Sequence, residues 1–250
     1  MNAAEQYLHD RGLKRETWQS YGVEIYETEI AAPFWERLKP GKGKFSLINN
    51  HAAESLWIPC HGPNGADELL WQVRIFSTLP ELNRFHIPQG QRSPVWISPQ
   101  ADAAAKDVLK PIYITEGLIK GMALAQAGVC AIGISGVWDV AEPNGEKKKD
   151  LRTVDERDAE RLNPKPKPKP KPYHIRKEFA EFRWLSRKVY LCFDADQASN
   201  PNVRQAVIRS FFLFSIQGAK VYQVEWPIGE GKGIDDWLRA RGQDEAGNTN

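Results

Sequence analysis

The chain has 250 residues, 41% of them hydrophobic, and a net charge of +2, which suits one large domain or two small ones and neither requires nor excludes nucleic acid. It contains no run of about 18 apolar residues, and its start, "MNAAEQYLHDRG", is charged, so we expect neither a membrane span nor a signal peptide. Three scattered cysteines are too few for a disulfide framework or a paired CxxC zinc pattern, which fits a reducing compartment. With no membrane span or signal peptide expected, we expect a cytoplasmic protein with no membrane partner.

The first region, residues 1–107, is predicted to form a small α+β subdomain. "AAEQYLHDRG" predicts a helix, and "LKRETWQSYGVEIY" predicts a second helix and a strand. "SLWIPCHG", the turn "PNGADE" and "LLWQVRIF" predict a β-hairpin, with short strands in "NRFHIPQG" and "SPVWISP". Trp57, Trp71 and Trp96 are candidates for stacking on bases, although aromatic residues in strands are more often part of the core.

The second region, residues 108–242, changes rhythm. Strands are predicted in "PIYITEG", "VCAIGISG", "RKVYLCFDAD" and "AKVYQVEWP", and helices in "LIKGMALAQAG", "PNVRQAVIRSFFLFSIQG" and "IDDWLRARG". Strands that alternate with helices predict an α/β domain whose mostly parallel sheet is covered on both faces. Residues 243–250 are expected to be a flexible tail.

A charged insertion at about 141–174 separates the second and third predicted strands. It ends in "PKPKPKPKP", which cannot join a helix or a central strand and favours an extended polyproline II conformation. We favour a solvated spacer, and the alternative is a lysine arm that follows a phosphate backbone. "YHIRKEFAEFRWLS", which comes next, predicts the crossover helix.

Acidic residues follow three of the four predicted strands of this region. Glu116 ends the first, Asp194 and Asp196 end the third, and Asp235 and Asp236 follow the fourth. Each alone is compatible with a turn or a helix cap. Together they are expected at one edge of the sheet, where carboxylates repel one another unless a positive charge lies among them. Hard oxygen ligands favour Mg²⁺ or Mn²⁺, which indicates phosphoryl or nucleotidyl transfer.

Three segments of the second region resemble the acidic motifs of the toprim domain. These are "YITEGLIKGMALAQAG", "VYLCFDADQAS" and "GKGIDDWL", and this Mg²⁺-dependent module is shared by bacterial DnaG-type primases, topoisomerases and some nucleases. In the first region, "YLHDRGLKRETWQSYGV", "SLWIPCHGPNGADELLWQVRIF" and "RFHIPQGQRSPVWIS" are similar to segments of the catalytic core of DnaG-type primases. The whole is most similar to primase-like toprim proteins of plasmids and phages.

This resemblance implies a toprim Rossmann-like sheet flanked by helices and preceded by a primase-core subdomain. It implies that Glu116 acts as general acid or base, or as a metal ligand. It also implies that Asp194, Asp196 and either Asp235 or Asp236 join Glu116 in holding two Mg²⁺ ions.

Four basic residues are implied to bind nucleotide or nucleic acid. Arg74 and Arg84 correspond to cations expected near template or nucleotide phosphates, and an exposed cation or a surface ion pair is the alternative for both. Lys232 precedes the last acidic motif. Lys120 stands where primases usually have an aspartate, which removes a potential metal ligand and places a cation beside a nucleotide phosphate.

The function implied is that of a primase-like nucleotidyltransferase, which makes short oligonucleotides on single-stranded DNA from nucleoside triphosphates. Its setting would be the replication of a mobile element, with a replicative helicase as a candidate partner. A toprim nuclease that hydrolyses DNA or RNA phosphodiesters is one alternative, and a non-catalytic nucleic-acid or replisome binding module is another. An aspartate-nucleophile phosphatase fits less well, because its D-x-D follows the first strand of its sheet.

Overall fold

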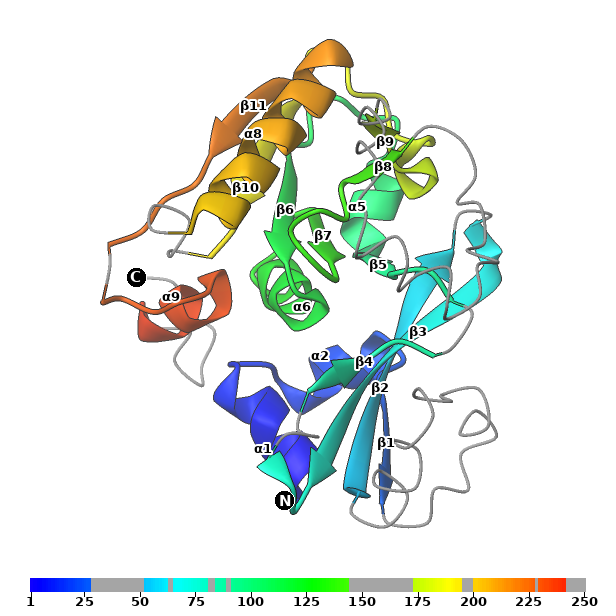
Figure 1. Cartoon of the computed structure of the whole chain (residues 1–250), viewed down its shortest axis with the longest axis vertical. Coiled ribbons are helices and arrows are strands. Elements are labelled where there is room, and N and C mark those ends of the chain that lie inside the picture. The colour runs from blue at the N-terminus through cyan, green and yellow to red at the C-terminus, as the bar shows by residue number, and fades with distance from the viewer. Residues whose placement is uncertain are drawn as a thin grey trace, which may run out of the picture.

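Strands from both regions of the chain join in one curled sheet in the computed structural model (Figure 1). The structure describes residues 1–27, 52–62, 65–80, 84–88, 91–143, 173–194, 200–227 and 229–241. The helices are α1 (Ala3–Asp10), α2 (Arg15–Ser20), α5 (Pro99–Ala103), α6 (Leu118–Gln126), α8 (Pro201–Ile216) and α9 (Ile234–Ala240). The strands are β1 (Glu24–Glu27), β2 (Ala52–Gly62), β3 (Gly65–Ser77), β4 (Phe85–His86), β5 (Val95–Ile97), β6 (Ile112–Glu116), β7 (Ala131–Ile134), β8 (Ala141–Pro143), β9 (Tyr173–Ile175), β10 (Lys188–Cys192) and β11 (Lys220–Gln223).

The sheet has a parallel and an antiparallel part. Its order is β11-β10-β6-β7-β5-β2-β3-β4, with β1 paired to β2, which makes nine strands among the described residues. The four strands predicted for the second region are all parallel, and the predicted hairpin of β2 and β3 is present. The antiparallel pair of β5 and β7 joins strands of the first and second regions in one sheet. The division of the chain into two domains at residue 107 remains a prediction.

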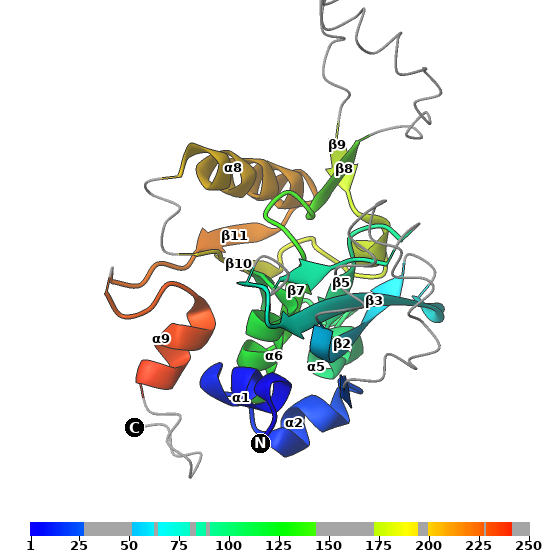
Figure 2. The same ribbon diagram turned by 60° about the horizontal axis from the view of Figure 1, so that its bottom comes forward.

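Two apolar cores lie on opposite faces of the sheet. Side chains alternate along each strand, so Ile112 and Ile114 of β6 face one core while Tyr113 packs against the other. The first core is covered by α5 and α8, and the second by α1, α2, α6 and α9. Figure 2 shows α8 on one side of the sheet and α1, α2 and α6 on the other. The predicted α/β architecture with helices on both faces is therefore confirmed.

The predicted crossover helix after the insertion is wrong. The segment forms β9, which pairs with β8, and a short 3₁₀ helix at Lys177–Phe179. The cause is Arg176, which is buried and donates a hydrogen bond to the Ser93 carbonyl at 2.7 Å while it pairs with Glu178. These bonds tie the chain down in an extended course. Residues 144–172, which carry the Lys-Pro run, lie outside the described residues.

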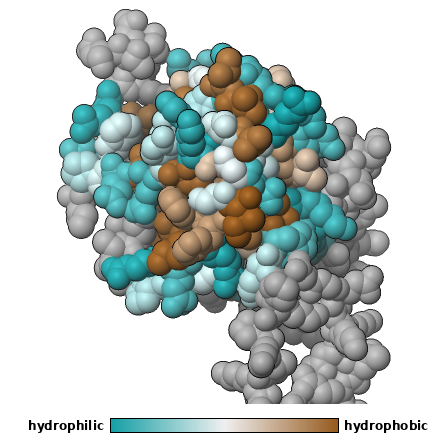
Figure 3. All heavy atoms as spheres, turned by 90° about the horizontal axis from the view of Figure 1, so that it is seen from above, coloured by the Kyte–Doolittle hydropathy of each residue, from teal (hydrophilic) through white to brown (hydrophobic). Residues whose placement is uncertain are grey.

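The three tryptophans that could stack on bases are buried, whereas several apolar side chains of α8 are exposed to solvent. Trp57, Trp71 and Trp96 are buried, so the core interpretation of these tryptophans is confirmed. In contrast, the outer side of α8 exposes four large apolar side chains, and hydrophobic surface stands out when the molecule is viewed from above (Figure 3). These exposed residues are Ile208, Phe211, Phe212 and Ile216. In the part of the chain that the structure describes, no helix combines the length and hydropathy needed to cross a bilayer.

Candidate active site

The sheet brings the ends of β6 and β10 together. Thr115 pairs with Cys192 in the parallel register, so Glu116 and Asp194 follow at the same edge. Asp194 is 9% exposed, and Glu116 is half-buried. Gly117 comes next with φ of +100°, a backbone conformation that glycine adopts without strain, and it turns the chain directly into α6. This turn places the first residues of α6 beside Asp194.

Lys120 points from the first turns of α6 at the carboxylate of Asp194. Its Nζ donates a hydrogen bond to Asp194 Oδ1, and only 16% of the Lys120 side chain and 13% of the Asp194 side chain are exposed. A second ammonium, that of Lys232, lies 4.0 Å from Asp194 Oδ2 on a side chain that is 70% exposed. The structure thus brings Lys120 and Lys232 to the acidic edge, and their contacts with nucleotide or nucleic acid stay a prediction.

Asp235 joins this group from the start of α9. Its side chain is 1% exposed, and its Oδ2 accepts a hydrogen bond from Arg11 at 2.8 Å. Gly233, two residues before Asp235, packs against Asp235 and Lys120. A Cβ at this glycine would collide with Asp235 Oδ1 and would stand 2.6 Å from Lys120 Cε and 3.1 Å from Lys120 Nζ. The side chains of Asp235 and Lys120 therefore pack against the same glycine.

Asp236 has a different task. Its Oδ2 accepts a hydrogen bond from the Gly233 N–H at 3.2 Å, so it caps the helix that Asp235 begins. The sequence left the two aspartates as alternatives for the last acidic position. The burial of Asp235 and its nearness to Lys120 favour Asp235.

Arg11, at the end of α1, was not among the residues predicted for the site. Burial alone would lower the pKa of its guanidinium, but the hydrogen bond and the charge of Asp235 outweigh burial and raise it. The signal in the sequence was the "RGL" of the first motif. The motif does not indicate that the partner of Arg11 is Asp235, which lies 224 residues further along the chain.

Arg74 and Arg84 lie apart from the carboxylates. The Arg74 guanidinium lies over the ring of Tyr7 at 4.2 Å and close to Phe76 and Phe85, and burial lowers its pKa. The charge of Arg11 lowers it further, which places Arg74 near the Arg11 end of the site. Arg84 is exposed beside β4, and no bond joins it to Asp194 or Asp235.

The donor set partly fits a divalent cation. Among the described residues no group of three or more His, Cys, Asp or Glu side chains is close enough to hold a metal ion, and Asp196 lies outside them. The oxygens are of the kind Mg²⁺ prefers, and Asp235 Oδ1 is a buried acceptor without a hydrogen-bond partner. This oxygen is a buried acceptor that a cation could satisfy. The repulsion from which the sequence predicted one is already reduced by Lys120 and Arg11.

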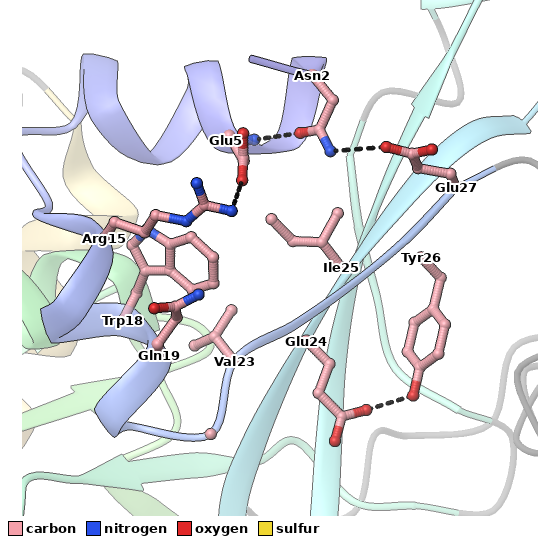
Figure 4. A pocket seen from close by; sticks show the side chains of 11 residues that line it. Asn2, Glu5, Arg15, Trp18, Gln19, Val23, Glu24, Ile25, Tyr26 and Glu27 are labelled. Atoms are coloured by element: carbon pink, nitrogen blue, oxygen red, sulfur yellow. Dashed lines mark hydrogen bonds and ion pairs between the residues drawn. The ribbon is translucent and has the colours of Figure 1, made fainter.

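A separate pocket of about 720 Å³ lies between α1, α2 and β1 (Figure 4). Its lining includes Glu5, Glu24 and Glu27 with Arg15, and Arg15 pairs with Glu5 at 2.8 Å. None of the predicted site residues lines it. Its acidic character does not suit a polyanion such as nucleic acid.

A family model described as "Domain of unknown function (DUF3854)" matches residues 103–245, which is more than half of the chain. The chain belongs to the DUF3854 family. The matched residues include all of the acidic positions at the sheet edge, together with Lys120 and Lys232. The contribution of Arg11 comes from outside the DUF3854 match.

An uncharacterized protein of Picosynechococcus sp. is 30% identical over 138 residues, which are 53% of this DUF3854 chain and 12% of that protein. Two solved structures share the fold. One is the Aquifex aeolicus primase, zinc-binding and RNA polymerase domains, with a TM-score of 0.50 over 99% of this chain and 53% of that one. The other is the DnaG catalytic core, with a TM-score of 0.54 over 97% and 70%. Both are 14% identical to this chain, so they show its fold.

Proposed function

We propose that this chain is a primase-like nucleotidyltransferase with a toprim-type centre, which synthesises short oligonucleotides on single-stranded DNA. One observation carries the proposal. Glu116, Asp194 and Asp235, from three separate segments, reach the carboxyl edge of a parallel sheet whose fold is that of primase cores. In open α/β sheets this edge is where ligands bind.

The chain's own residues divide into two groups at this edge. Asp194 and Asp235, with Glu116 and Asp196, would hold Mg²⁺ or Mn²⁺, which when bound neutralises phosphate charge and lowers the pKa of an attacking hydroxyl. Glu116 is the candidate to accept the proton of that hydroxyl. Lys120 and Lys232 would contact the phosphates of the nucleotide, because both ammonium groups already lie at the carboxylate of Asp194.

The wider setting follows from the same proposal. The substrates would be nucleoside triphosphates and the template single-stranded DNA, with Arg74 and Arg84 near the phosphates of the template strand or the nucleotide. A replicative helicase, replication of a plasmid or phage and a cytoplasmic location belong to this proposal as well.

The test is primer synthesis on single-stranded DNA with Mg²⁺ or Mn²⁺. Asp194→Ala and Asp196→Ala, singly and together, should reduce product by about a hundredfold or more, as does the loss of a preorganised charge in other active sites. Asp107→Ala is the matched control, because Asp107 is exposed in the loop at the opposite end of β6 and should leave synthesis unchanged. Absence of product from the wild type with every nucleotide mixture, or equal product from the double variant, overturns the proposal. Shortening of labelled DNA without nucleotides identifies a nuclease instead.

A second candidate, a binding module without catalysis, is favoured by the ion pairs of Lys120 and Arg11. These pairs compensate the charges of Asp194 and Asp235 without a metal ion. Such a module would bind single-stranded DNA equally well with and without a chelator. The Asp194→Ala/Asp196→Ala variant would then retain full binding and full function in a replication assay.

A further inference from the structure

Three residues from separate segments of the chain meet beside α8. The Cζ of Arg209, in the middle of α8, lies 4.4 Å from the ring centroid of Trp138 and 3.9 Å from that of Tyr173. Trp138 belongs to the loop between β7 and β8, and Tyr173 begins β9, which pairs with β8 next to α8 (Figure 2). The three segments therefore present a guanidinium and two aromatic rings at one place.

The rings of this cluster are exposed, unlike the tryptophans of the strands. Trp138 is 36% exposed and Tyr173 is 40% exposed. Phe212, which is 60% exposed, follows Arg209 by three residues on α8, and residues three apart on a helix are neighbours on its surface. We call Trp138, Tyr173, Arg209 and Phe212 the aromatic patch. Several exposed apolar rings in one place, in contrast to single ones, mark a binding surface.

The guanidinium of Arg209 indicates what this surface binds. Its five N–H donors lie in the plane of the group, whereas a ring packs against its flat face. In the part of the chain that the structure describes, Arg209 contacts the two rings and forms no ion pair or hydrogen bond. The two carboxylates described in this loop and in β8 and β9 have other partners, since Asp139 lies 4.0 Å from Arg176 and Glu142 pairs with Arg92 at 3.0 Å. The donors of Arg209 therefore suit an anion from outside the chain.

Single-stranded nucleic acid supplies both groups that such a surface binds. Its bases stack on aromatic rings, and stacking does not depend on sequence because every base has a flat π face. Its phosphates accept charge-assisted hydrogen bonds from a guanidinium. An acidic protein segment would satisfy the guanidinium as well, so the position of the patch is needed to choose between these two partners.

The patch lies close to the acidic edge of the sheet, which favours nucleic acid. β7 is in parallel register with β6, so Ile134 lies beside Glu116, about 5 Å away. Trp138 follows Ile134 by four residues, which span at most about 14 Å. The Cα atoms of Trp138 and Glu116 are thus within about 19 Å of each other. A strand held at the acidic edge reaches the patch in about six nucleotides at the stacked spacing of about 3.4 Å.

We propose that the aromatic patch binds single-stranded DNA, with bases stacked on Trp138, Tyr173 and Phe212 and a backbone phosphate on Arg209. The inference rests on the proposed function for the identity of this strand, which is the template that leads to the acidic edge. The patch adds an interaction surface on the α8 side of the sheet, apart from Arg74 beside α1.

The experiment measures binding without any synthesis. The full chain is titrated into a fluorescein-labelled oligothymidine, with a chelator and without nucleotides, and fluorescence anisotropy gives the Kd. Trp138→Ala and Tyr173→Ala should each raise the Kd about tenfold, through the loss of one base–aromatic stack. Arg209→Gln should reduce the slope of log Kd against log salt by about 0.7, the contribution of one phosphate on a single strand.

Tyr222→Ala is the matched control and should leave the Kd unchanged. Tyr222 is 42% exposed, much like Tyr173, but it stacks on Tyr190 at 5.2 Å on the opposite face of the sheet from α8. Circular dichroism checks that each variant is folded, because Arg209 also ties α8 to the segments of its two aromatic partners.

A second measurement needs no variant. Oligonucleotide with bromodeoxyuridine in place of thymidine is crosslinked to the wild-type chain by ultraviolet light, and mass spectrometry locates the attached residues. Crosslinks should include Trp138 or Tyr173. If the alanine variants do not fold, these crosslinks decide the question by themselves.

Each outcome bears on the inference in a distinct way. A weaker Kd in either folded alanine variant, with crosslinks in the patch, supports it. An unchanged Kd and salt slope in the folded variants overturns it, as do crosslinks that all lie elsewhere. A wild type that does not bind oligothymidine also overturns it and leaves the patch to a protein partner. Crosslinks in the patch of a chain that makes no primers overturn the proposed function alone, and primer synthesis with crosslinks only elsewhere overturns the inference alone.

Discussion

Replacement of Arg11 by alanine tests the charge balance of the site through stability. Arg11 is the ion-pair partner of Asp235, whose side chain is 1% exposed, and its Nη1 donates to Asp235 Oδ2 at 2.8 Å. Asp235 Oδ1 already lacks a hydrogen-bond partner. Arg11→Ala therefore leaves a buried carboxylate without its ion-pair partner.

The size of the effect follows from burial. Breaking a buried ion pair by removing one partner costs about 3–5 kcal/mol. The Arg11 side chain is 34% exposed, so water replaces part of what is lost, and we expect the free energy of unfolding to fall by about 3 kcal/mol, the lower end of that range. The Arg15–Glu5 pair has the same 2.8 Å separation, but the Arg15 side chain is 68% exposed. Arg15→Ala should therefore cost no more than about 1 kcal/mol.

Urea unfolding of the wild type and both variants, followed by circular dichroism, measures these differences. The Arg11→Ala/Asp235→Asn double variant completes a mutant cycle. It should be more stable than the sum of the two single losses predicts, because removing both charges leaves no unpaired ion. The reasoning is refuted if Arg11→Ala and Arg15→Ala lose the same free energy.

Two further predictions concern packing and reactivity. Gly233→Ala should lower the free energy of unfolding by about 1–3 kcal/mol, because the new Cβ collides with Asp235 and Lys120. Gly136→Ala is the control, since the nearest atom to its new Cβ is 3.5 Å away, and it should stay within about 1 kcal/mol of the wild type. Equal losses in urea unfolding would contradict this. Burial raises the pKa of Cys192 to about 12 and also raises that of Cys60, so both thiols stay protonated at pH 8. Burial also keeps both thiols away from reagents in solution. A thiol reagent should therefore label Cys130 first in the native protein and all three only after unfolding, and early labelling of Cys60 or Cys192, located by mass spectrometry, would count against it.

The pattern of apolar residues along the sequence was enough to predict the parallel part of the sheet. Alternating apolar strands and helices from residue 108 fix β6, β7, β10 and β11, and the rule that loops at the carboxyl ends of such strands share one edge brings Glu116 close to Asp194. The helix predicted after the insertion failed for a reason the pattern does not contain. Arg176 is bound to a carbonyl of Ser93, 83 residues earlier, and this contact decides the local conformation.

The counter-charges of the site were also hidden from the sequence. The predicted repulsion among carboxylates was sound, but the cation nearest to Asp194 is Lys120, a residue read at first as a missing ligand. The partner of Asp235 is Arg11, near the other end of the chain. Acidic positions can be placed from topology because strand ends are local. Their partners cannot, because a salt bridge depends on how distant helices pack.

Arg11 also bears on whether residues 108–242 form a unit that is independent of residues 1–107. The strand β7 pairs with β5 on one side, and α6 packs into a core that includes Leu8 of α1 and Trp18 of α2. Without the first region, β7 would become an edge strand, this core would meet water, and Asp235 would lose its partner. A carboxylate of the proposed catalytic edge thus depends on a charge supplied from outside the matched family domain, so the site is completed by both regions together.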